Sequence, residues 1–436
     1  MTAMHPCNRV LVYIDAYAPY ANAVTNAVMP AVRQLAKRCR VDVFTARMDR
    51  GAPRTEICEQ TEITRFESLL PHFRIRLAEA HHRSPHTVSP PLRPVVRLLR
   101  HNGCYRLLDR LYCAFLSPVQ RKLKRLLLRG GYDTLITVSS PITPQLDALA
   151  LAKRGVFAAN GIRWIPYFVD PFATFIGYRE MRDDLMPLEC AVFEAADTVI
   201  TSPELAADYL HYPLGAFAEK TKAVPFTNLR ALPETGEADF LTKGKINCLY
   251  VGSLFCVDVR DPSYFYRLAA ACPEDIEFHI VCYEADEPNL RLKRELLDGL
   301  PRVHWHERLP LEMCLGAMCK ADVLINLGNL CSNQTPSKVF DYMGAGRPIV
   351  NLYGIDADTS MAALSRYPMR LNVRNKAALD PADVAAFSAF CRENAGKRIA
   401  FSEVAARYPE LTADACAQTF VDIVTGAAEP GEAARA

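Results

Sequence analysis

The segment TPSKVFDYMGAGRPIVNL, residues 335–352, combines groups suited to a phosphate and to a sugar hydroxyl. Thr335 is a favourable N-cap and Pro336 suits the first helical position, so we expect a helix to begin at Pro336. Its first turn would present backbone amides and Lys338 to an anion, at the positive end of the helix dipole. Lys338 and Asp341 lie three residues apart, on one face. This spacing predicts a phosphate at Lys338 and a ribose diol at Asp341; the alternative is an ordinary surface ion pair.

The glycines of this segment are expected to end the helix. A dinucleotide fingerprint needs glycines after a strand and at the start of a helix. Gly344 and Gly346 instead follow the helical run and precede the apolar residues Ile349 and Val350. We therefore place the anion at the start of the helix and a helix terminus at the glycines.

The rest of the chain supplies the elements that would position this helix. A chain of 436 residues, half of them apolar, is long enough for two domains. Short β-branched and aromatic runs alternate with helical patterns, which is typical of parallel sheets covered by helices. The expected strands begin at Arg9, Val41, Thr134, Trp164 and Asp197, and then at Ile246, Phe278, Val303, Asp322 and Pro348. The fold class is therefore α/β, with two Rossmann-like domains facing each other across a cleft.

The domain boundaries follow from a polar stretch without periodicity, residues 229–245, which we interpret as a linker. Residues 1–230 form the expected N-terminal, acceptor-side domain, and residues 246–400 form the C-terminal, donor domain. Residues 401–426 are expected to be a helix that crosses back to the N-terminal domain. The small and charged residues 427–436 are expected to be a flexible tail.

Several segments resemble one family of enzymes. PSKVFDYMGAGRPIV, from Pro336, is similar to the donor-binding motif of the GT-B glycosyltransferases grouped as glycosyltransferase family 4. VFEAADTVITSPELAADYL from Val192, VGSL from Val251 and FSEVAARYPELTADACAQTF from Phe401 resemble the same family. The resemblance implies transfer of a sugar, with retention, from a nucleotide-sugar donor to a polysaccharide or lipid-linked glycan. The alternatives are a sugar-nucleotide epimerase on the same plan and a non-catalytic nucleotide-sugar-binding subunit.

The resemblance also implies which residues contact the donor. Ser337 and Lys338 would lie at the phosphates and Asp341 at the ribose. Asn333 occupies the position where the family often has a first glutamate, and Arg260 is the nearest cation after VGSL, where the family has a basic pair. The glycine pair that commonly follows the first strand is absent. The donor-binding set is Gly252, Ser253, Arg260, Asn333, Thr335, Ser337, Lys338 and Asp341.

Two acidic residues of the N-terminal domain are candidates for a catalytic base. Asp15 follows the first expected strand and Asp170 follows WIPYFV, so both lie at carboxyl ends of parallel strands, where ligands bind. The alternative for each is a helix or turn cap. In retaining members of the family the departing phosphate takes the acceptor proton, and Lys338 would stabilise the growing charge on the diphosphate. No metal or other cofactor is then required.

Other metal-site patterns are weak. Asp356 and Asp358 form a DxD, which is more often a solvated turn. His304 and His306 share a face without a clear third ligand. Fifteen cysteines occur without a CxxC pair, which favours reduced, buried thiols. Lys plus Arg number 51 against 49 for Asp plus Glu, so composition gives no reason to expect a nucleic-acid partner.

A basic segment suggests a membrane surface. Between Arg93 and Arg129 there are ten basic residues and one acidic residue, Asp109, interleaved with apolar residues at helical spacing. Such a helix suits anionic lipid or a lipid-linked acceptor; the alternative is a core helix with a solvated basic face. We assign this surface to Arg121, Lys122, Lys124 and Arg125. With no signal peptide and no apolar span, we expect a cytoplasmic protein, peripheral on the inner face of the membrane.

Overall fold

The chain folds into two compact units. The computed structural model describes residues 9–18, 23–48, 51–58, 61–67, 117–139, 142–176, 179, 182–225, 229–234, 236–254, 259–285, 287–306 and 309–427. Unit 1 comprises Met1–Thr227 and Asp414–Ala436, and unit 2 comprises Asn228–Ala413. The last helix, α17 (Ala413–Thr425), therefore lies almost wholly in unit 1. The expected tail, residues 428–436, lies outside the described residues.

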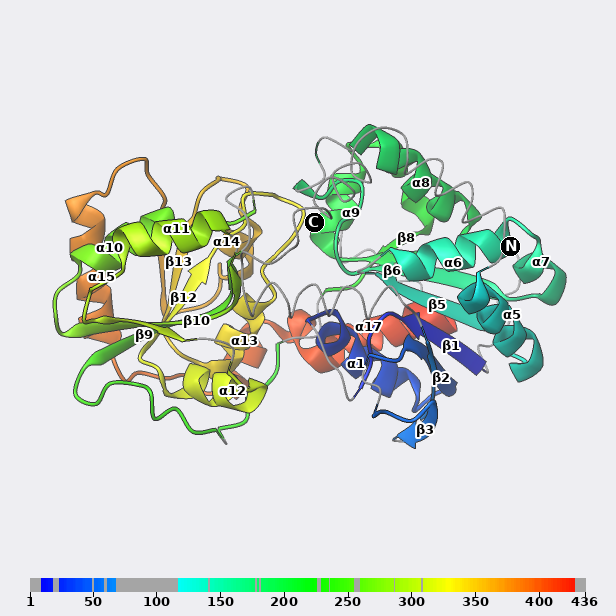
Figure 1. The fold of residues 1–436 in the computed structure, drawn as a ribbon, viewed down its shortest axis with the longest axis horizontal. Helices are drawn as coiled ribbons and strands as arrows, with labels where there is room; N and C mark the ends of the chain where they lie inside the picture. The colour runs from blue at the N-terminus through cyan, green and yellow to red at the C-terminus, as the bar shows by residue number, and fades with distance from the viewer. Residues whose placement is uncertain are drawn as a thin grey trace. The chain divides into compact units, whose positions relative to one another are not determined.

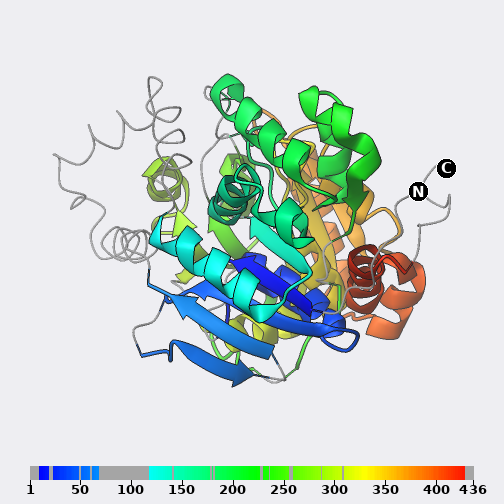
Figure 2. The ribbon, with the colours of Figure 1, turned by 90° about the vertical axis from the view of Figure 1, so that its right-hand side faces the viewer.

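Unit 1 is built on an eight-stranded sheet. Its strand order is β3 (Thr55–Cys58), β4 (Thr61–Phe66), β2 (Arg40–Ala46), β1 (Arg9–Ile14), β5 (Thr134–Ser139), β6 (Arg163–Phe168), β7 (Val199–Thr201) and β8 (Thr221–Ala223). Every pair is parallel except β3 with β4. Figure 2 shows β1 and β2 side by side in blue. The strand order reverses direction between β1 and β5, which makes the carboxyl edge there the usual ligand position in such sheets.

Helices cover both faces of this sheet (Figure 1). One face is covered by α5 (Pro118–Gly130), α6 (Thr143–Ala152), α7 (Val156–Asn160), α8 (Arg182–Ala195) and α9 (Pro203–Tyr209), whose apolar residues join the strands in one core. A 3₁₀ segment, Pro213–Lys220, precedes β8. On the other face, α1 (Ala23–Leu35) and α17 lie together, and Phe420 of α17 packs 5.6 Å from Tyr167 of β6, measured between ring centroids.

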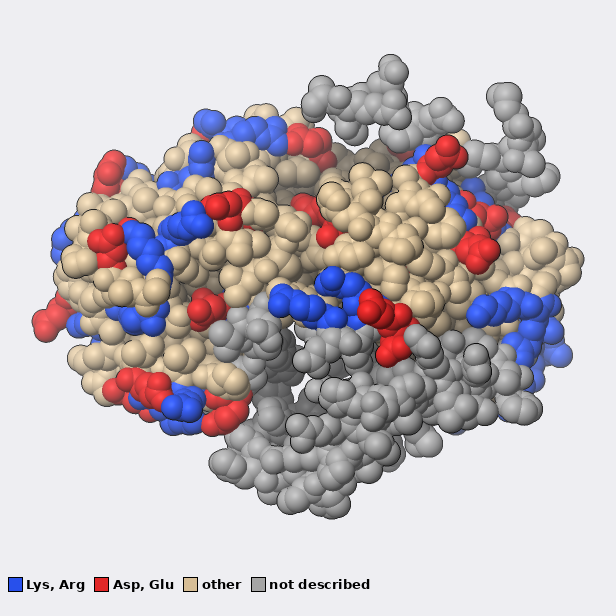
Figure 3. Space-filling model, turned by 90° about the horizontal axis from the view of Figure 1, so that it is seen from above, with Lys and Arg blue, Asp and Glu red and all other residues tan. Residues whose placement is uncertain are grey.

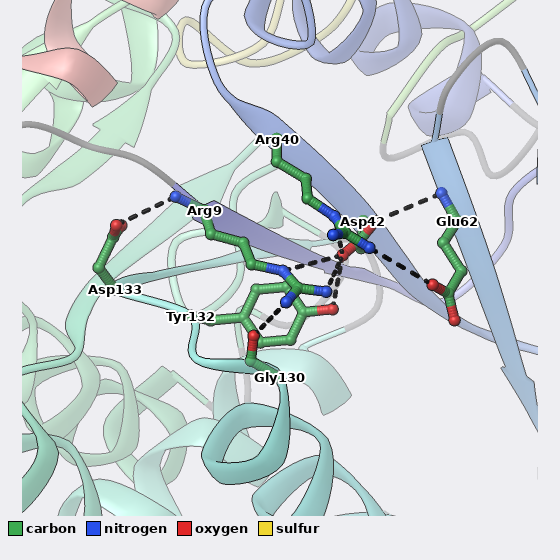
Figure 4. A network of polar contacts seen from close by, with 7 residues as sticks. All are labelled: Arg9, Arg40, Asp42, Glu62, Gly130, Tyr132 and Asp133. Carbon is green, nitrogen blue, oxygen red and sulfur yellow. Dashed lines mark hydrogen bonds and ion pairs between the residues drawn. The ribbon is translucent and has the colours of Figure 1, made fainter.

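A polar network closes the amino edge of the unit 1 sheet (Figure 4). The buried Asp42 accepts hydrogen bonds from Arg9 Nη2 at 3.0 Å and from Tyr132 Oη at 2.8 Å. The Asp133 carboxylate accepts from the Arg9 backbone amide at 3.0 Å. Because this edge is opposite the carboxyl ends of the strands, the network stabilises the sheet and takes no part in the candidate site.

Unit 2 is built on a six-stranded parallel sheet. Its strand order is β11 (Val303–His306), β10 (Ile276–Ala285), β9 (Ile246–Leu254), β12 (Val323–Leu327), β13 (Ile349–Tyr353) and β14 (Arg370–Arg374). One face is covered by α10 (Ser263–Ala271), α11 (Glu287–Leu296) and α15 (Pro381–Asn394), and the opposite face by α12 (Leu311–Lys320) and α13 (Lys338–Ala345) (Figure 1). The short helices are α14 (Thr359–Ala363), α16 (Phe401–Arg407) and a 3₁₀ turn, Pro409–Leu411. The order reverses between β9 and β12.

The expected fold class is confirmed, since both units are Rossmann-like α/β layers. All ten expected strands are present. Four further strands, β3, β4, β8 and β14, were not expected, because they lack long apolar runs. The expected linker belongs to unit 2 and contains no strand in its described part, residues 229–234 and 236–245. It packs on α12, where Gly236 lies so close to Gly316 that a Cβ on Gly236 would be 2.9 Å from the Gly316 Cα.

Candidate functional site

The reversal between β9 and β12 brings most of the predicted donor residues together. Gly252 and Ser253 lie near the end of β9, and the loop after β12 leads into α13. In parallel sheets the carboxyl ends of the strands at such a reversal form the ligand crevice. The structure therefore positions these residues where the topology favours a ligand.

The motif helix begins two residues later than expected. α13 starts at Lys338, with Ser337 as its N-cap residue in a right-handed helical conformation and without a side-chain cap. Val339 N donates to the Pro336 carbonyl at 3.0 Å and Phe340 N to the Ser337 carbonyl at 3.2 Å. These short-range bonds make a tight turn that precedes the α-helix, so Lys338 occupies the first helical position.

Two cations meet at this turn. Arg260 donates from Nη2 to Asn329 Oδ1 at 2.7 Å and from Nη1 to the Ser253 carbonyl at 3.1 Å. Its buried Nε makes no hydrogen bond among the described residues. Lys338 lies close to Gly252, because a Cβ on Gly252 would be 3.1 Å from Lys338 Cε. The glycine leaves room for the lysine stem, and the guanidinium is held by backbone and amide oxygens.

Burial and then the charge of Arg260 lower the pKa of Lys338 to about 8, against the opposite effect of Asp341. A lysine held beside an arginine in a poorly solvated position is unfavourable in the empty protein. An anion between the two cations would reverse that cost. Such a pair of cations would favour an anionic ligand.

Asp341 has the opposite shift. Burial raises its pKa to about 6, although Arg230 and then Lys338 act to lower it. Its side chain is 17% exposed, and its Oδ1 accepts no hydrogen bond among the described residues. A buried carboxylate oxygen without a donor is costly unless a ligand supplies one, and a ribose hydroxyl is such a donor.

The rest of α13 fixes its position on the sheet. Tyr342 is fully buried, and its hydroxyl accepts from Val251 N of β9 at 3.0 Å. Gly346 ends the helix with a φ of 71°, as the sequence predicted. The glycines also allow close packing: a Cβ at Gly344 would lie 2.2 Å from the Arg230 carbonyl oxygen. They therefore terminate the helix and allow it to pack closely.

The loop before α13 is held from within. Asn329 Nδ2 donates to the Gln334 carbonyl at 2.9 Å, and Thr359 Oγ1 donates to the same carbonyl at 3.2 Å. The predicted donor residues Asn333 and Thr335 are buried in this loop. Arg260 and the loop thus form one hydrogen-bonded unit through Asn329.

Sequence reasoning missed the role of Asp358. Asp356 is 79% exposed and pairs with Arg374, as a solvated turn would. Asp358 is buried, caps α14 by accepting from Ser360 N at 2.8 Å, and feels the charge of Arg260. The only sequence signal was the Asp-x-Ser capping pattern before a helix.

The histidines form hydrogen bonds to protein groups. His304 pairs with Glu277, and His279 lies 3.2 Å from His306 and 3.0 Å from Asn247 Oδ1. In the part of the chain that the structure describes, no cluster of three or more His, Cys, Asp or Glu side chains could hold a metal ion.

The two candidate bases belong to unit 1. Asp15 directly follows β1, and its backbone carbonyl accepts from Ala46 N at 3.2 Å. Asp170 follows β6 by two residues and is partly exposed. Behind it, the fully buried Glu189 accepts from Ala173 N and from Tyr209 Oη, both at 2.8 Å. Burial raises the pKa of Glu189 to about 7, so this carboxyl group anchors the Asp170 loop and is itself poised to titrate.

Only part of the predicted basic segment can be examined, because residues 93–116 lie outside the described residues. In α5, Arg121 and Arg125 are exposed and Lys124 is partly exposed. Lys122 points inward instead: its Nζ donates to the Arg65 carbonyl at 2.8 Å and lies over Phe44, and burial lowers its pKa. No described helix is both long and apolar enough to span a bilayer.

The chain is similar to known proteins in its structure but matches none by sequence family. No family model and no curated protein matches the chain. Sucrose-phosphate synthase from Thermosynechococcus elongatus is 14% identical over 96% of this chain and 94% of its own, with a TM-score of 0.56. Anabaena HepE, solved with UDP-glucose, is 12% identical over 96% and 99%, with a TM-score of 0.60. An E. coli trehalose-6-phosphate protein bound with UDP-2-fluoro glucose is 13% identical over 96% and 98%, with a TM-score of 0.57. The chain therefore has the GT-B fold of these proteins.

Proposed function

We propose that the protein is a glycosyltransferase that moves a sugar from a nucleotide-sugar donor to a glycan acceptor. The observation that carries this proposal is the pairing of Lys338 with Arg260 at the reversal between β9 and β12. Two of the structurally similar proteins were solved with UDP-glucose or UDP-2-fluoro glucose, which supports a nucleotide sugar as the ligand.

In this reaction the bond between the sugar C1 and the diphosphate oxygen breaks, and an acceptor oxygen bonds to C1. Negative charge grows on the leaving diphosphate, and Lys338 and Arg260 would stabilise it more than they stabilise the intact donor. With retention, the leaving phosphate takes the acceptor proton. The two cations supply the charge that a metal ion would supply elsewhere, so we propose that no metal is needed.

We assign the remaining donor contacts to residues of α13 and of the loop before it. Asp341 would accept hydrogen bonds from the ribose hydroxyls, for which its buried Oδ1 is suited. Ser337 would meet the phosphates at the start of α13, and Asn333 and Thr335 the sugar. Asp15 and Asp170, at the carboxyl ends of β1 and β6, would serve the acceptor side.

Turnover measurements with a panel of sugar nucleotides test the proposal. A transferase releases nucleoside diphosphate only when an acceptor is present, apart from slow hydrolysis. An epimerase interconverts donors without an acceptor, and a binding subunit binds nucleoside diphosphate without turnover. A wild-type chain that binds no nucleoside diphosphate at all would overturn all three.

Variants assign the roles within the site. Lys338→Ala should lower kcat more than it raises the donor KM, because the charge it balances develops during the reaction. Asp341→Asn should chiefly raise KM, because the ribose is held alike in ground and transition states. Lys320→Ala is the matched control. Lys320 lies on the neighbouring helix α12 and donates a hydrogen bond to the Gly236 carbonyl, so its removal should change neither kcat nor the donor KM.

We further propose that the acceptor is polysaccharide or lipid-linked and that α5 contacts an anionic membrane surface from the cytoplasmic side. Arg121, Lys124 and Arg125 are the groups that support this, and Figure 3 shows Lys and Arg gathered at the right-hand edge of the face it draws. Each exposed cation near such a surface contributes about 1 kcal/mol. Replacing the three with Gln should abolish sedimentation with vesicles containing phosphatidylserine, whereas Lys122→Gln should instead lower thermal stability. Equal sedimentation of the triple variant and the wild type would contradict the membrane role.

A further inference from the structure

The segment that leads into unit 2 is fixed against the motif helix. Leu229 is buried, and its carbonyl accepts from Ala413 N at 2.8 Å. The next carbonyl, that of Arg230, packs on α13 where Gly344 leaves room: a Cβ on Gly344 would lie only 2.2 Å from it. The backbone of Arg230 is therefore held on one face of α13.

That face also carries Asp341, three residues before Gly344. Arg230 Nη2 lies 3.9 Å from Asp341 Oδ1, which is within ion-pair range but too long for a hydrogen bond. Asp341 Oδ1 accepts no hydrogen bond among the described residues. Arg230 is therefore close enough to interact electrostatically with the carboxylate, but it does not occupy the lone pairs of Oδ1. A ligand hydroxyl could bond to Oδ1 without displacing the arginine.

Few charges act on this carboxylate. Among the described residues, those acting on Asp341 are Arg230 from the segment before β9 and Lys338 from α13 itself. The titratable groups that face Lys338 from neighbouring elements are Arg260, Cys282 and Cys314. Lys338 is committed to the phosphate side in the proposed function, which leaves Arg230 as the partner available to Asp341 in both empty and occupied states.

We propose that Arg230 is a positioning residue of the donor site, which keeps Asp341 ionised in the empty protein and so keeps it ready to accept a ribose hydroxyl. The ribose part rests on the proposed function. The ionisation part does not, because it follows from the distance between the two side chains and the burial of the carboxylate.

Thermal unfolding without ligand tests the ionisation part. The difference in stability between the wild type and Asp341→Asn should grow as pH rises and level off near the pKa of Asp341 in the folded protein. The same difference in stability can be measured without Arg230, between the single variant Arg230→Gln and the double variant Arg230→Gln/Asp341→Asn. It should level off about one pH unit higher, because an opposite charge at this distance lowers a carboxyl pKa by about that amount. Equal levelling points would overturn the inference, whatever the protein binds.

Binding of uridine 5′-diphosphate tests the ribose part. Arg230→Gln should weaken binding about threefold at pH 6.5, where most of its Asp341 would be protonated while most of the wild-type Asp341 is ionised, and hardly at all at pH 8. Arg230→Lys should restore most of the affinity at pH 6.5. In the Asp341→Asn background Arg230→Gln should have no further effect; an equal loss there would show that Arg230 acts elsewhere.

Arg398→Gln is the matched control. Arg398 also lies beside α13, donating from Nε to the Ala345 carbonyl at 3.1 Å and pairing with Glu234, but it does not act on Asp341. Arg398→Gln should leave unchanged both the pH at which the stability difference levels off and the pH dependence of uridine 5′-diphosphate binding. If the wild type binds no nucleoside diphosphate while Arg230→Gln still moves the levelling point, the proposed function fails and the pairing of Arg230 with Asp341 stands.

Discussion

Lys338 and Arg260 share one end of the unit 2 sheet, where burial and the charge of the arginine together lower the pKa of Lys338 to about 8. Like charges in a poorly solvated place repel, so the empty protein carries a cost that an anionic ligand removes. The cost is tolerated because Arg260 is fixed by Asn329 and Ser253. This relationship makes the pH dependence of ligand binding a direct test of the site.

Nucleoside diphosphate affinity should fall as pH rises above 8. Below that pH Lys338 is protonated in the empty site, and above it binding must be accompanied by proton uptake, so affinity should fall by up to about tenfold per pH unit. Calorimetric titrations at pH 8.5 in two buffers of different ionisation enthalpy should reveal the uptake. Lys338→Ala should bind more weakly and show no uptake. An unchanged uptake in that variant would assign the titration to another group.

Asp341→Asn should stabilise the empty protein while weakening its ligand binding. The pKa of Asp341 is raised to about 6, so the stability associated with its protonated form is present at low pH and is lost as pH rises through 6. Above pH 6 the Asn variant should therefore be more stable, by up to about 3 kcal/mol. Melting curves from pH 4 to 8 give the difference. Asp356→Asn, at an exposed aspartate, should show no such gain, and a loss of stability in Asp341→Asn would refute the account.

The strands were predictable because their apolar and β-branched runs are continuous. Strands such as β9 and β12 are buried on both faces, so every residue contributes to the pattern. The edge strands β3 and β14 carry mostly polar side chains, and Val373 of β14 is the one buried residue that the structure describes in them, so neither strand has a continuous apolar run. No local pattern could therefore identify them.

The site was predictable to the extent that it is local. Lys338 and Asp341 lie on one helix, and the position of Arg260 relative to Lys338 followed only from a family resemblance. The contacts of Arg230 and Asp358 with the site could not be found, because the Arg230 carbonyl packs against Gly344 and the Asp358 side chain against Gly328, and neither approach leaves a spacing signal in the sequence. Lys122 was misjudged for a related reason: its acceptor is a backbone carbonyl on β4.

Substitutions at Gly328 and Asp358, which lie in contact beside the loop before α13, should have non-additive effects on stability. A Cβ on Gly328 would lie only 2.7 Å from Asp358 Cγ, so Gly328→Ala should destabilise unit 2 and disturb the loop. Asp358→Ala alone should cost about 1 kcal/mol, the usual value of a lost N-cap. The double variant should be no less stable than Asp358→Ala, because the colliding carboxylate is gone. Urea unfolding of the four proteins measures the coupling, and strictly additive losses would rule out the collision.

Asp42→Ala should destabilise unit 1 strongly (Figure 4). The carboxylate is 4% exposed and accepts from Arg9 and Tyr132, so its removal deprives the Arg9 guanidinium of this carboxylate and the Tyr132 hydroxyl of this acceptor. Breaking a buried pair costs about 3–5 kcal/mol, and we expect the lower end because Arg9 is 26% exposed. Arg40→Ala is the control within the same network: Arg40 is 58% exposed and 3.6 Å from Asp42, so its loss should cost less than about 1 kcal/mol. If Asp42→Ala and Arg40→Ala lost similar amounts of stability, the exposed Arg40 would matter as much to the network as the buried Asp42.

Glu189 offers a test of whether the loop after β6 matters for activity. Its carboxyl group accepts from Ala173 N and Tyr209 Oη inside the unit 1 core. Glu189→Gln preserves both contacts, because the amide oxygen can accept from Ala173 and the tyrosine hydroxyl can accept from the amide nitrogen. Glu189→Leu leaves a buried amide hydrogen without an acceptor, which costs about 1–3 kcal/mol, and it frees the loop that carries Asp170.

The two variants should therefore separate charge from positioning. The pKa of Glu189 is raised to about 7, so stability in the wild type is lost as pH rises through 7, and Glu189→Gln should become progressively more stable than the wild type between about pH 4.5 and 7. Its kcat should stay near that of the wild type at pH 8. Glu189→Leu should be less stable at every pH, and it should raise the acceptor KM while leaving nucleoside diphosphate binding unchanged, because the donor residues belong to unit 2. An acceptor KM that is normal in a folded Glu189→Leu protein would remove the Asp170 loop from the acceptor site.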